Sequence, residues 1–418
     1  MTERHDPSSS AAQNAPPLWE YVALTDYQVP QDSLQQTMRK RLDFLRDWYK
    51  REIQQEKDTS DSPFMPDEGL QQLPDWQLEQ IAPSPLSQSA LPSLNELMEP
   101  WLSNEANNPN VMLFVEPPHA DYADTLEKWA KQHEWLILQP PETKAILQGG
   151  TNWLTSIADL EQPWFLPALE HIYLRHVDGL DLVRAFLDQA FSGALGQGVI
   201  ACNSWAWAFL KHVWQGRSPV PRVVQAFDSD KLAQHFQNLA DQAKPRHFAF
   251  RQADDGSYII PLPEPITEQA APQSNDNPFL RHLAAHSRGI PGVARAIWRD
   301  NLRTEPDKAL NTANKNQDYE RTIWVAAWEA IQHPKLPNDT DPNNLFILHS
   351  LLLQGGLNTD ALRLILTSIP PHQITATLLR LERSDIITHK QGRWQVTPQA
   401  YPVVRSFLAT HNMLLDDF

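Results

Sequence analysis

Cysteine is almost absent from this sequence and glycine is scarce. The single cysteine, Cys202, excludes a disulfide framework and paired-cysteine zinc sites, and it is typical of a reducing cytoplasm. Only 14 glycines occur in 418 residues, so we expect no glycine-dependent phosphate site. The chain also lacks the ~18-residue apolar run that spans a bilayer and an apolar export signal at its start. These absences predict a soluble, cytoplasmic protein of bacterial type.

Positive charge is also in short supply. The formal net charge is −16, which argues against a free-standing binder of nucleic acid or anionic membrane, because both depend on excess Lys and Arg. The length predicts two or three domains. Apolar strand-like runs alternate with amphipathic helical runs from about residue 108 to 262. This alternation predicts an α/β domain with a mainly parallel sheet.

The stretch Val111–Leu126, VMLFVEPPHADYADTL, is the most informative part of that domain. Its first five residues are all apolar, as in a strand buried on both faces, and helical spacing begins near His119. Strand, tight turn and helix build a phosphate-binding loop. The plainer alternative is an ordinary strand–turn–helix unit, which any α/β protein contains.

The chemistry of a phosphate-binding loop is missing from this stretch. Pro117 and Pro118 cannot donate a backbone N–H to a phosphate. Acidic, aromatic and methyl side chains stand where the pattern G-x-x-x-x-G-K-[ST] requires glycine, lysine and a hydroxyl. The positions concerned are Glu116, Asp121, Tyr122 and Ala123.

Three later motifs follow in the order of a nucleotide-binding domain. The strand near 164–169 has Pro167 and Ala168 where an acidic pair would hold magnesium, and Glu170 stands alone after them. Asn203 follows an apolar run, either as a polar sensor or as the N-cap of the next helix. Gly292 and Arg295 have a G-x-x-R spacing that resembles the lid of AAA+ and STAND-type ATPases, where the arginine lies near the γ-phosphate. The alternative is a surface helix that pairs Arg295 with Arg299.

A compact unit of three helices and a hairpin follows from about 340 to 418, in the order of a winged helix. Its third helix is expected to turn Thr377 and Arg380 outward, and Lys390 and Arg393 in the hairpin could reach phosphates. Residues 345–418 contain six Lys/Arg and five Asp/Glu, however, which is too few cations for a typical DNA module. We therefore expect protein contacts ahead of DNA contacts.

Taken together, these motifs resemble those of the AAA+ and STAND-type P-loop ATPases, with an architecture similar to that of the origin-recognition and Cdc6-like ATPases. The resemblance is one of order and spacing over residues 108 to 418, and it departs from the family at the nucleotide contacts. It implies an α/β fold with a P-loop-like, mainly parallel sheet, a helical lid, a C-terminal winged helix and an N-terminal helical arm. The expected parts are 1–17 (disordered tail), 18–107 (helix and extended arm), 108–262 (α/β domain), 278–335 (lid) and 340–418 (winged helix).

A strong amphipathic helix is predicted from Gln31 to Gln55. One face is basic and could contact a membrane surface or a partner, although a solvated face on a docked helix is the favoured interpretation. The basic residues taken as candidate contacts are Arg39, Arg41, Arg46 and Lys50.

The function we expect is a non-catalytic scaffold or adaptor, which is not an enzyme. Its degenerate nucleotide site would be filled by its own side chains, Tyr122 among them, with no cofactor, metal or nucleotide. The expected partners are other proteins, including a membrane-associated protein or a second copy of the chain. Two alternatives stay open: a DNA-binding regulator that uses the winged helix, and an ATPase with non-standard nucleotide ligands.

Overall fold

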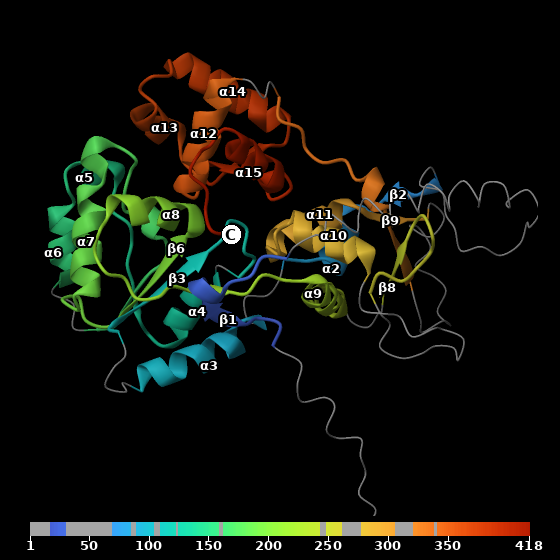
Figure 1. The fold of residues 1–418 in the computed structure, drawn as a ribbon, viewed down its shortest axis with the longest axis horizontal. Coiled ribbons are helices and arrows are strands. Elements are labelled where there is room, and N and C mark those ends of the chain that lie inside the picture. Colours follow the sequence, from blue (N-terminus) through green and yellow to red (C-terminus); the bar gives the residue numbers. More distant parts are fainter. Residues whose placement is uncertain are drawn as a thin grey trace, which may run out of the picture.

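The computed structural model describes residues 17–30, 69–84, 89–103, 109–122, 124–158, 162–242, 248–260, 277–305, 321–337 and 341–418. These residues form three lobes, and Phe418 lies where the lobes meet (Figure 1). The predicted basic helix 31–55 lies outside the described residues, and so do Arg39, Arg41, Arg46 and Lys50. None of the described helices is long and apolar enough to cross a membrane.

The first lobe is built on a six-stranded sheet with the order β1-β7-β3-β6-β5-β4. All neighbouring strands are parallel except β1, which runs antiparallel to β7. The mainly parallel α/β fold is therefore confirmed. The strands are β1 (Tyr21–Ala23), β3 (Val111–Glu116), β4 (Leu136–Ile137), β5 (Trp164–Leu166), β6 (Gly198–Asn203) and β7 (Arg222–Val224).

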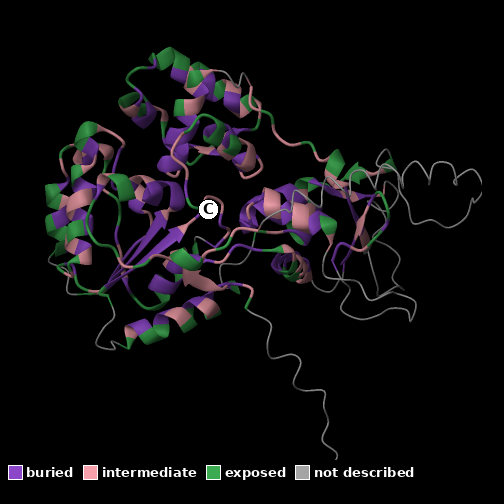
Figure 2. Ribbon diagram, in the orientation of Figure 1, coloured by how far each residue is buried: buried purple, intermediate pink, exposed green. Residues whose placement is uncertain are grey.

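Strand β3 is buried on both faces because its alternate side chains enter two different cores. Leu113 and Val115 face one core and Met112 and Phe114 face the other. The continuous apolar run that predicted this strand follows from that position (Figure 2). The flanking helices are α3 (Leu91–Leu102), α4 (Asp124–Gln132), α5 (Thr143–Leu147), α6 (Thr151–Ala158), α7 (Asp181–Phe191) and α8 (Ser204–Val213).

The second lobe combines helices with a second sheet that the sequence did not predict. Its four strands have the order β2-β9-β10-β8, and β8 pairs in parallel with β10. The α/β domain expected over residues 108–262 therefore ends earlier, because its last strand-like run, near residues 248–252, belongs to this second sheet. The elements are β2 (Gln71–Gln72), α2 (Asp75–Ile81), α9 (Ser229–Asp241), β8 (Phe248–Gln252), α10 (Pro278–His286), α11 (Pro291–Asp300), β9 (Leu302–Thr304) and β10 (Arg321–Val325).

The third lobe contains the three expected helices and hairpin, followed by a fourth helix. Gln391 and Gly392 both have positive φ, at 51° and 78°, as a two-residue hairpin turn requires. Thr377 was expected to face outward, but it is buried because it lies on the packed side of its helix. The elements are α12 (Pro342–Leu353), α13 (Thr359–Ile365), α14 (Pro371–Arg383), β11 (Ile387–Lys390), β12 (Arg393–Val396) and α15 (Tyr401–Thr410).

Residues 411–418 return from α15 and join all three lobes. Phe418 is buried in the α/β core and its ring lies 4.6 Å from that of Tyr27. The Nε of Arg288, next to α10, donates to the backbone oxygen of Phe418 at 2.7 Å. The buried Asp416 carboxylate accepts from the hydroxyl of Ser204 at 2.6 Å and pairs with Arg405 of α15 at 3.1 Å. This segment therefore fixes the third lobe against the other two.

Candidate functional site

The loop that follows β3 differs from a phosphate-binding loop in its backbone. Helix α4 begins at Asp124, five residues later than the helical pattern from His119 predicted. His119 and Asp121 adopt left-handed conformations, with φ of 62° and 60°, that glycine adopts more readily. Holding two non-glycine residues there costs about 1 kcal/mol or more each, so neighbouring contacts must stabilise the loop. Ala123 lies outside the described residues.

The beginning of α11 supplies these contacts. The backbone N–H of Gly292 donates to the carbonyl oxygen of His119 at 3.1 Å. A Cβ at position 292 would lie only 2.2 Å from that oxygen, so glycine is required for this approach. Close contact between α11 and the loop thus explains Gly292, which the sequence marked by its spacing from Arg295.

Arg295 forms a two-pronged ion pair with Asp121. Its Nε lies 2.6 Å from Oδ2 and its Nη2 lies 2.9 Å from Oδ1. The exposed fractions of the two side chains are only 15% and 13%. The surface alternative for Arg295 is corrected here, because Arg299 instead pairs with Glu79 at 2.9 Å. The sequence named Asp121 and Arg295 separately, and the structure brings them together.

Tyr122 lies in an aromatic cluster that fills the space beside this ion pair. Its ring makes an edge contact with Trp19 at 5.6 Å, and Trp19 also lies 5.0 Å from Phe227 and 5.6 Å from His235. Tyr122, Trp19 and His235 are all buried. Burial lowers the pKa of His235 to about 4, which keeps its ring uncharged at neutral pH. Sequence reasoning missed Trp19 and His235.

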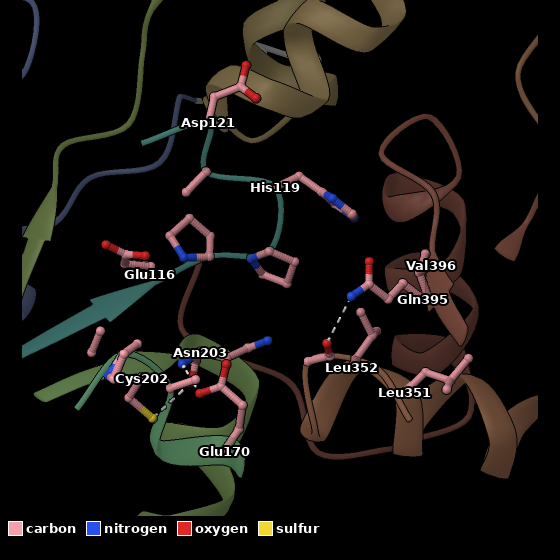
Figure 3. Close-up of a pocket in the computed structure, with 18 residues that line it drawn as sticks. Glu116, His119, Asp121, Glu170, Cys202, Asn203, Leu351, Leu352, Gln395 and Val396 are labelled. Carbon is pink, nitrogen blue, oxygen red and sulfur yellow. Dashed lines mark hydrogen bonds between the residues drawn. The ribbon is translucent and has the colours of Figure 1, made fainter. Parts of the chain in front are cut away.

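A cavity of about 380 Å³ lies on the other side of the loop. It opens at the carboxyl ends of β3, β5 and β6, where ligands bind in parallel sheets. Its far wall is formed by α12 and β12 of the third lobe (Figure 3). Pro167 and Ala168, which replace the expected acidic pair, both line it. The cavity is therefore shared by the α/β lobe and the third lobe.

Two carboxyl groups of the cavity have unusual ionisation. Burial raises the pKa of Glu116 to about 8, and the nearby carboxyls of Glu170 and Asp124 add to the rise. Burial also raises the pKa of Glu170, although the backbone N–H of Asn203 donates to its Oε2 at 3.0 Å and opposes the rise. Burial lowers the pKa of His119 to about 4. At neutral pH Glu116 is therefore mainly protonated and His119 is uncharged.

Asn203 performs the N-cap role that the sequence offered as one alternative. Its Oδ1 accepts from the backbone N–H of Trp205 at 2.9 Å, at the start of α8. Its own N–H contacts Glu170, so a polar sensor beside the loop stays a prediction. The described residues contain no group of three or more His, Cys, Asp or Glu side chains that could hold a metal ion.

The candidate contact residues of the third lobe are less free than we expected. Arg380 is partly exposed, and its guanidinium is held at 2.6 Å by Asp341, the N-cap of α12. Arg393 contacts the His171 ring of the α/β lobe, and burial lowers its pKa. Of the three cations expected to face a partner, Lys390 alone is exposed.

Comparison with known proteins gives structural likeness only. No protein-family model matches the sequence, and no curated protein matches it. A solved structure of Cdc6p from Pyrobaculum aerophilum is similar with a TM-score of 0.31 and 13% identity, over 84% of this chain and 97% of that one. A Walker-type ATPase of Pyrococcus abyssi is similar with a TM-score of 0.27 and 13% identity, over 75% and 95%.

These likenesses concern the fold, and they bear on one expectation. We expected that the chain is not an enzyme. The similarity to a Walker-type ATPase contradicts that expectation, which we withdraw.

Proposed function

We propose that this chain is a protein-interaction scaffold or adaptor, built on a fold like that of P-loop ATPases. The observation that carries the proposal is the ion pair between Asp121 and Arg295. A phosphate-binding loop offers positive charge and free N–H groups to its ligand. In this chain the arginine is already neutralised by a carboxylate of the loop, and the adjoining space is packed with Trp19 and Tyr122.

The loop in this arrangement connects lobes. It receives α11 through Gly292 and Arg295 on one side, and on the other the His119 ring lies 6.0 Å from that of Tyr401 in α15. Residues 411–418 add a second connection between the same lobes. A fixed arrangement of three lobes presents a constant surface, which suits a protein that holds partners together.

Exposed apolar side chains on the third lobe support a protein partner. Phe346 of α12 and Leu379 of α14 are 38% and 44% exposed, and the two helices that carry them pack against each other. The predicted winged-helix identity of this lobe belongs to the same proposal, with a protein as its favoured partner. A membrane-associated protein and a second copy of the chain are included among these partners.

Co-purification from the host under matched conditions tests the adaptor role. The intact chain should retain a defined set of proteins that the double variant Phe346→Ser with Leu379→Ser loses. Val177→Ser is the control, because Val177 is 81% exposed and lies on the α/β lobe. Equal recovery from all three proteins would contradict a partner surface on the third lobe.

An ATPase with non-standard ligands is the second candidate function, and the pair formed by Glu170 and Asn203 favours it. Asn203 ends β6 and Glu170 follows the neighbouring parallel strand β5, and the two residues are joined by a hydrogen bond of 3.0 Å. A carboxylate there could orient a water molecule. Calorimetry with ATP and Mg²⁺ separates the candidates: micromolar binding, with turnover lost in Glu170→Gln, would support this candidate and overturn our interpretation of residues 116–123.

A further inference from the structure

The cavity between the α/β lobe and the third lobe is lined by acidic residues and by no described lysine or arginine. Three carboxyl-bearing residues contribute to it: Glu116, Asp121 and Glu170. None of the described residues that line it is a lysine or arginine, and His119 is uncharged because burial lowers its pKa to about 4. An anionic ligand would meet carboxyl groups and no lysine or arginine among the described lining residues, so the lining disfavours it.

The carboxyl group of Glu116 has no cationic partner among the described residues. Asp121 is neutralised by Arg295, as described above. Glu170 receives the backbone N–H of Asn203 on one oxygen, and the nearby Arg393 guanidinium, which does not line the cavity, favours its charged form. No described residue donates a hydrogen bond to the Glu116 carboxyl, and only burial and like charges act on it. Glu116 and Glu170 therefore retain acceptor capacity toward a ligand in the cavity.

The wall opposite these carboxyl groups also carries partial negative charge. Helix α12 ends at Leu353, so the partial negative charge of its carboxyl end lies beside the cavity. Gly355 and Gly356, with φ of 58° and 102°, turn the chain there and line the cavity together with Leu351 and Leu352. The carbonyl oxygen of Gly355 receives only a long contact, 3.4 Å, from Nε2 of Gln395.

We propose that this cavity binds an organic cation, a guanidinium or primary ammonium group, with Glu116 and Glu170 as its counter-ions. A metal ion fits less well, because the described residues offer no group of three suitable ligand side chains. Apolar residues such as Ala201, Leu351 and Val396 would contact the hydrocarbon stem of the cation. The inference does not depend on the scaffold role, and it adds a ligand site to the junction of two lobes.

Proton release should accompany binding. A cation beside Glu116 favours its ionised form and returns its pKa toward the ordinary range. Because the pKa of Glu116 is about 8 in the empty cavity, about one proton should leave per cation bound near pH 7. A guanidinium group stays charged throughout this range. Its affinity should therefore rise from pH 6.5 to 8.5.

Calorimetry with two guanidinium probes tests the site on the full chain. Methylguanidinium represents a free small cation, and N-acetyl-argininamide represents an arginine side chain of a partner protein. The uncharged isostere N-acetyl-citrullinamide is the matched control ligand. Tighter binding of the capped arginine would assign the site to a protein side chain. Tighter binding of methylguanidinium would assign it to a small metabolite-sized cation, and either result supports the proposal.

Two further measurements test the proposal: the affinity of carboxyl variants and the number of protons released on binding. Glu116→Gln and Glu170→Gln should each weaken binding about tenfold or more, and Glu142→Gln, an exposed carboxylate of the same lobe, should leave it unchanged. Titration of the unaltered protein in two buffers of different ionisation enthalpy gives the proton count independently of any variant. Failure of both probes to bind, equal binding of the citrulline isostere, or binding without proton release would overturn the proposal.

Discussion

The backbone N–H of Gly292 donates to the carbonyl oxygen of His119 at 3.1 Å, and this contact sets the distance between α11 and the loop after β3. One turn further along α11, Arg295 reaches Asp121 in the same loop. Two features of the sequence that lie far apart in the chain thus form one junction. The first two predictions concern this junction.

Replacement Gly292→Ala should destabilise the protein by about 1–3 kcal/mol, as is usual for overpacking. The added methyl group would lie 2.2 Å from a backbone oxygen, which cannot rotate away as a side chain can. Chemical denaturation gives the change in the free energy of unfolding. Gly69→Ala is the control, since no atom lies within 4 Å of a Cβ at that position, and similar losses in both variants would contradict the packing argument.

Breaking the ion pair between Asp121 and Arg295 should lower the free energy of unfolding by more than breaking a surface ion pair does. Either Asp121→Ala or Arg295→Ala leaves a mostly buried charge without its partner, at a cost of about 3 kcal/mol. In a double-mutant cycle the two losses should not add, with a coupling of about 1–3 kcal/mol. The exposed pair of Lys131 with Glu127 provides the comparison, where the coupling should stay below about 0.5 kcal/mol.

Phe418→Ala should destabilise the arrangement of the lobes by about 3 kcal/mol, because the ring fills a position in the α/β core. Asp417→Ala, a change at the adjacent exposed residue, should have little effect although it removes the pair with Lys211. Thermal unfolding measures the two effects. A loss confined to the third lobe, detected by hydrogen exchange, would indicate that residues 411–418 do not couple the lobes.

Stability should fall as the pH rises from about 6.5 to 8. The folded state raises the pKa of Glu116 from 4.5 to about 8, so between these values the folded chain binds a proton that the unfolded chain has released. The stability that this proton supplies is lost as the pH approaches 8, by about 1–2 kcal/mol over the interval. His119 and His235, whose pKa values fall from 6.5 to about 4, contribute the opposite slope, and only below pH 6.5.

Denaturation curves collected across this range should show that slope, and Glu116→Gln should remove it. The same slope in Glu116→Gln would assign it to another group, such as Glu170, whose pKa is also raised by burial.

DNA should bind weakly to the third lobe, with a shallow dependence on salt. Arg380 is paired with Asp341, and Arg393 is partly buried against the α/β lobe, so few cations are free to release counter-ions. A filter-binding titration at several salt concentrations measures the slope of log affinity against log salt concentration. Lys390→Ala should reduce this slope by no more than the loss of one phosphate contact would. Nanomolar affinity with a steep slope would instead support the DNA-binding regulator.

The best-predicted elements are those whose own residues carry the signal, such as a continuous apolar run or a helix cap. Strands β3 and β6 are continuous apolar runs because both of their faces are covered, and Asn203 marks the start of α8 through its cap. The second sheet was not predicted, because β2 has two residues and β9 has three, and only their distant partners make them strands. Strand β1 escaped notice for the same reason.

Several residues of the candidate site were predicted from the sequence, but the contacts between them were not. Asp121 and Arg295 were selected by separate patterns, and no local signal indicated that they pair. Trp19 and His235 were missed because each looks like an ordinary core residue in its own segment. Their shared position beside Tyr122 depends on the meeting of three chain segments.

The pairing of β1 with β7 also has a consequence for biosynthesis. Contacts beside it, such as that between Gln28 and Gln225, join residues 197 positions apart. On the ribosome Trp19 therefore emerges long before Phe227 and His235, and β1 cannot pair until β7 has been synthesised. Residues 21–23 therefore stay without their pairing strand during the synthesis of about 200 residues, which is the kind of long-range pairing that slows folding.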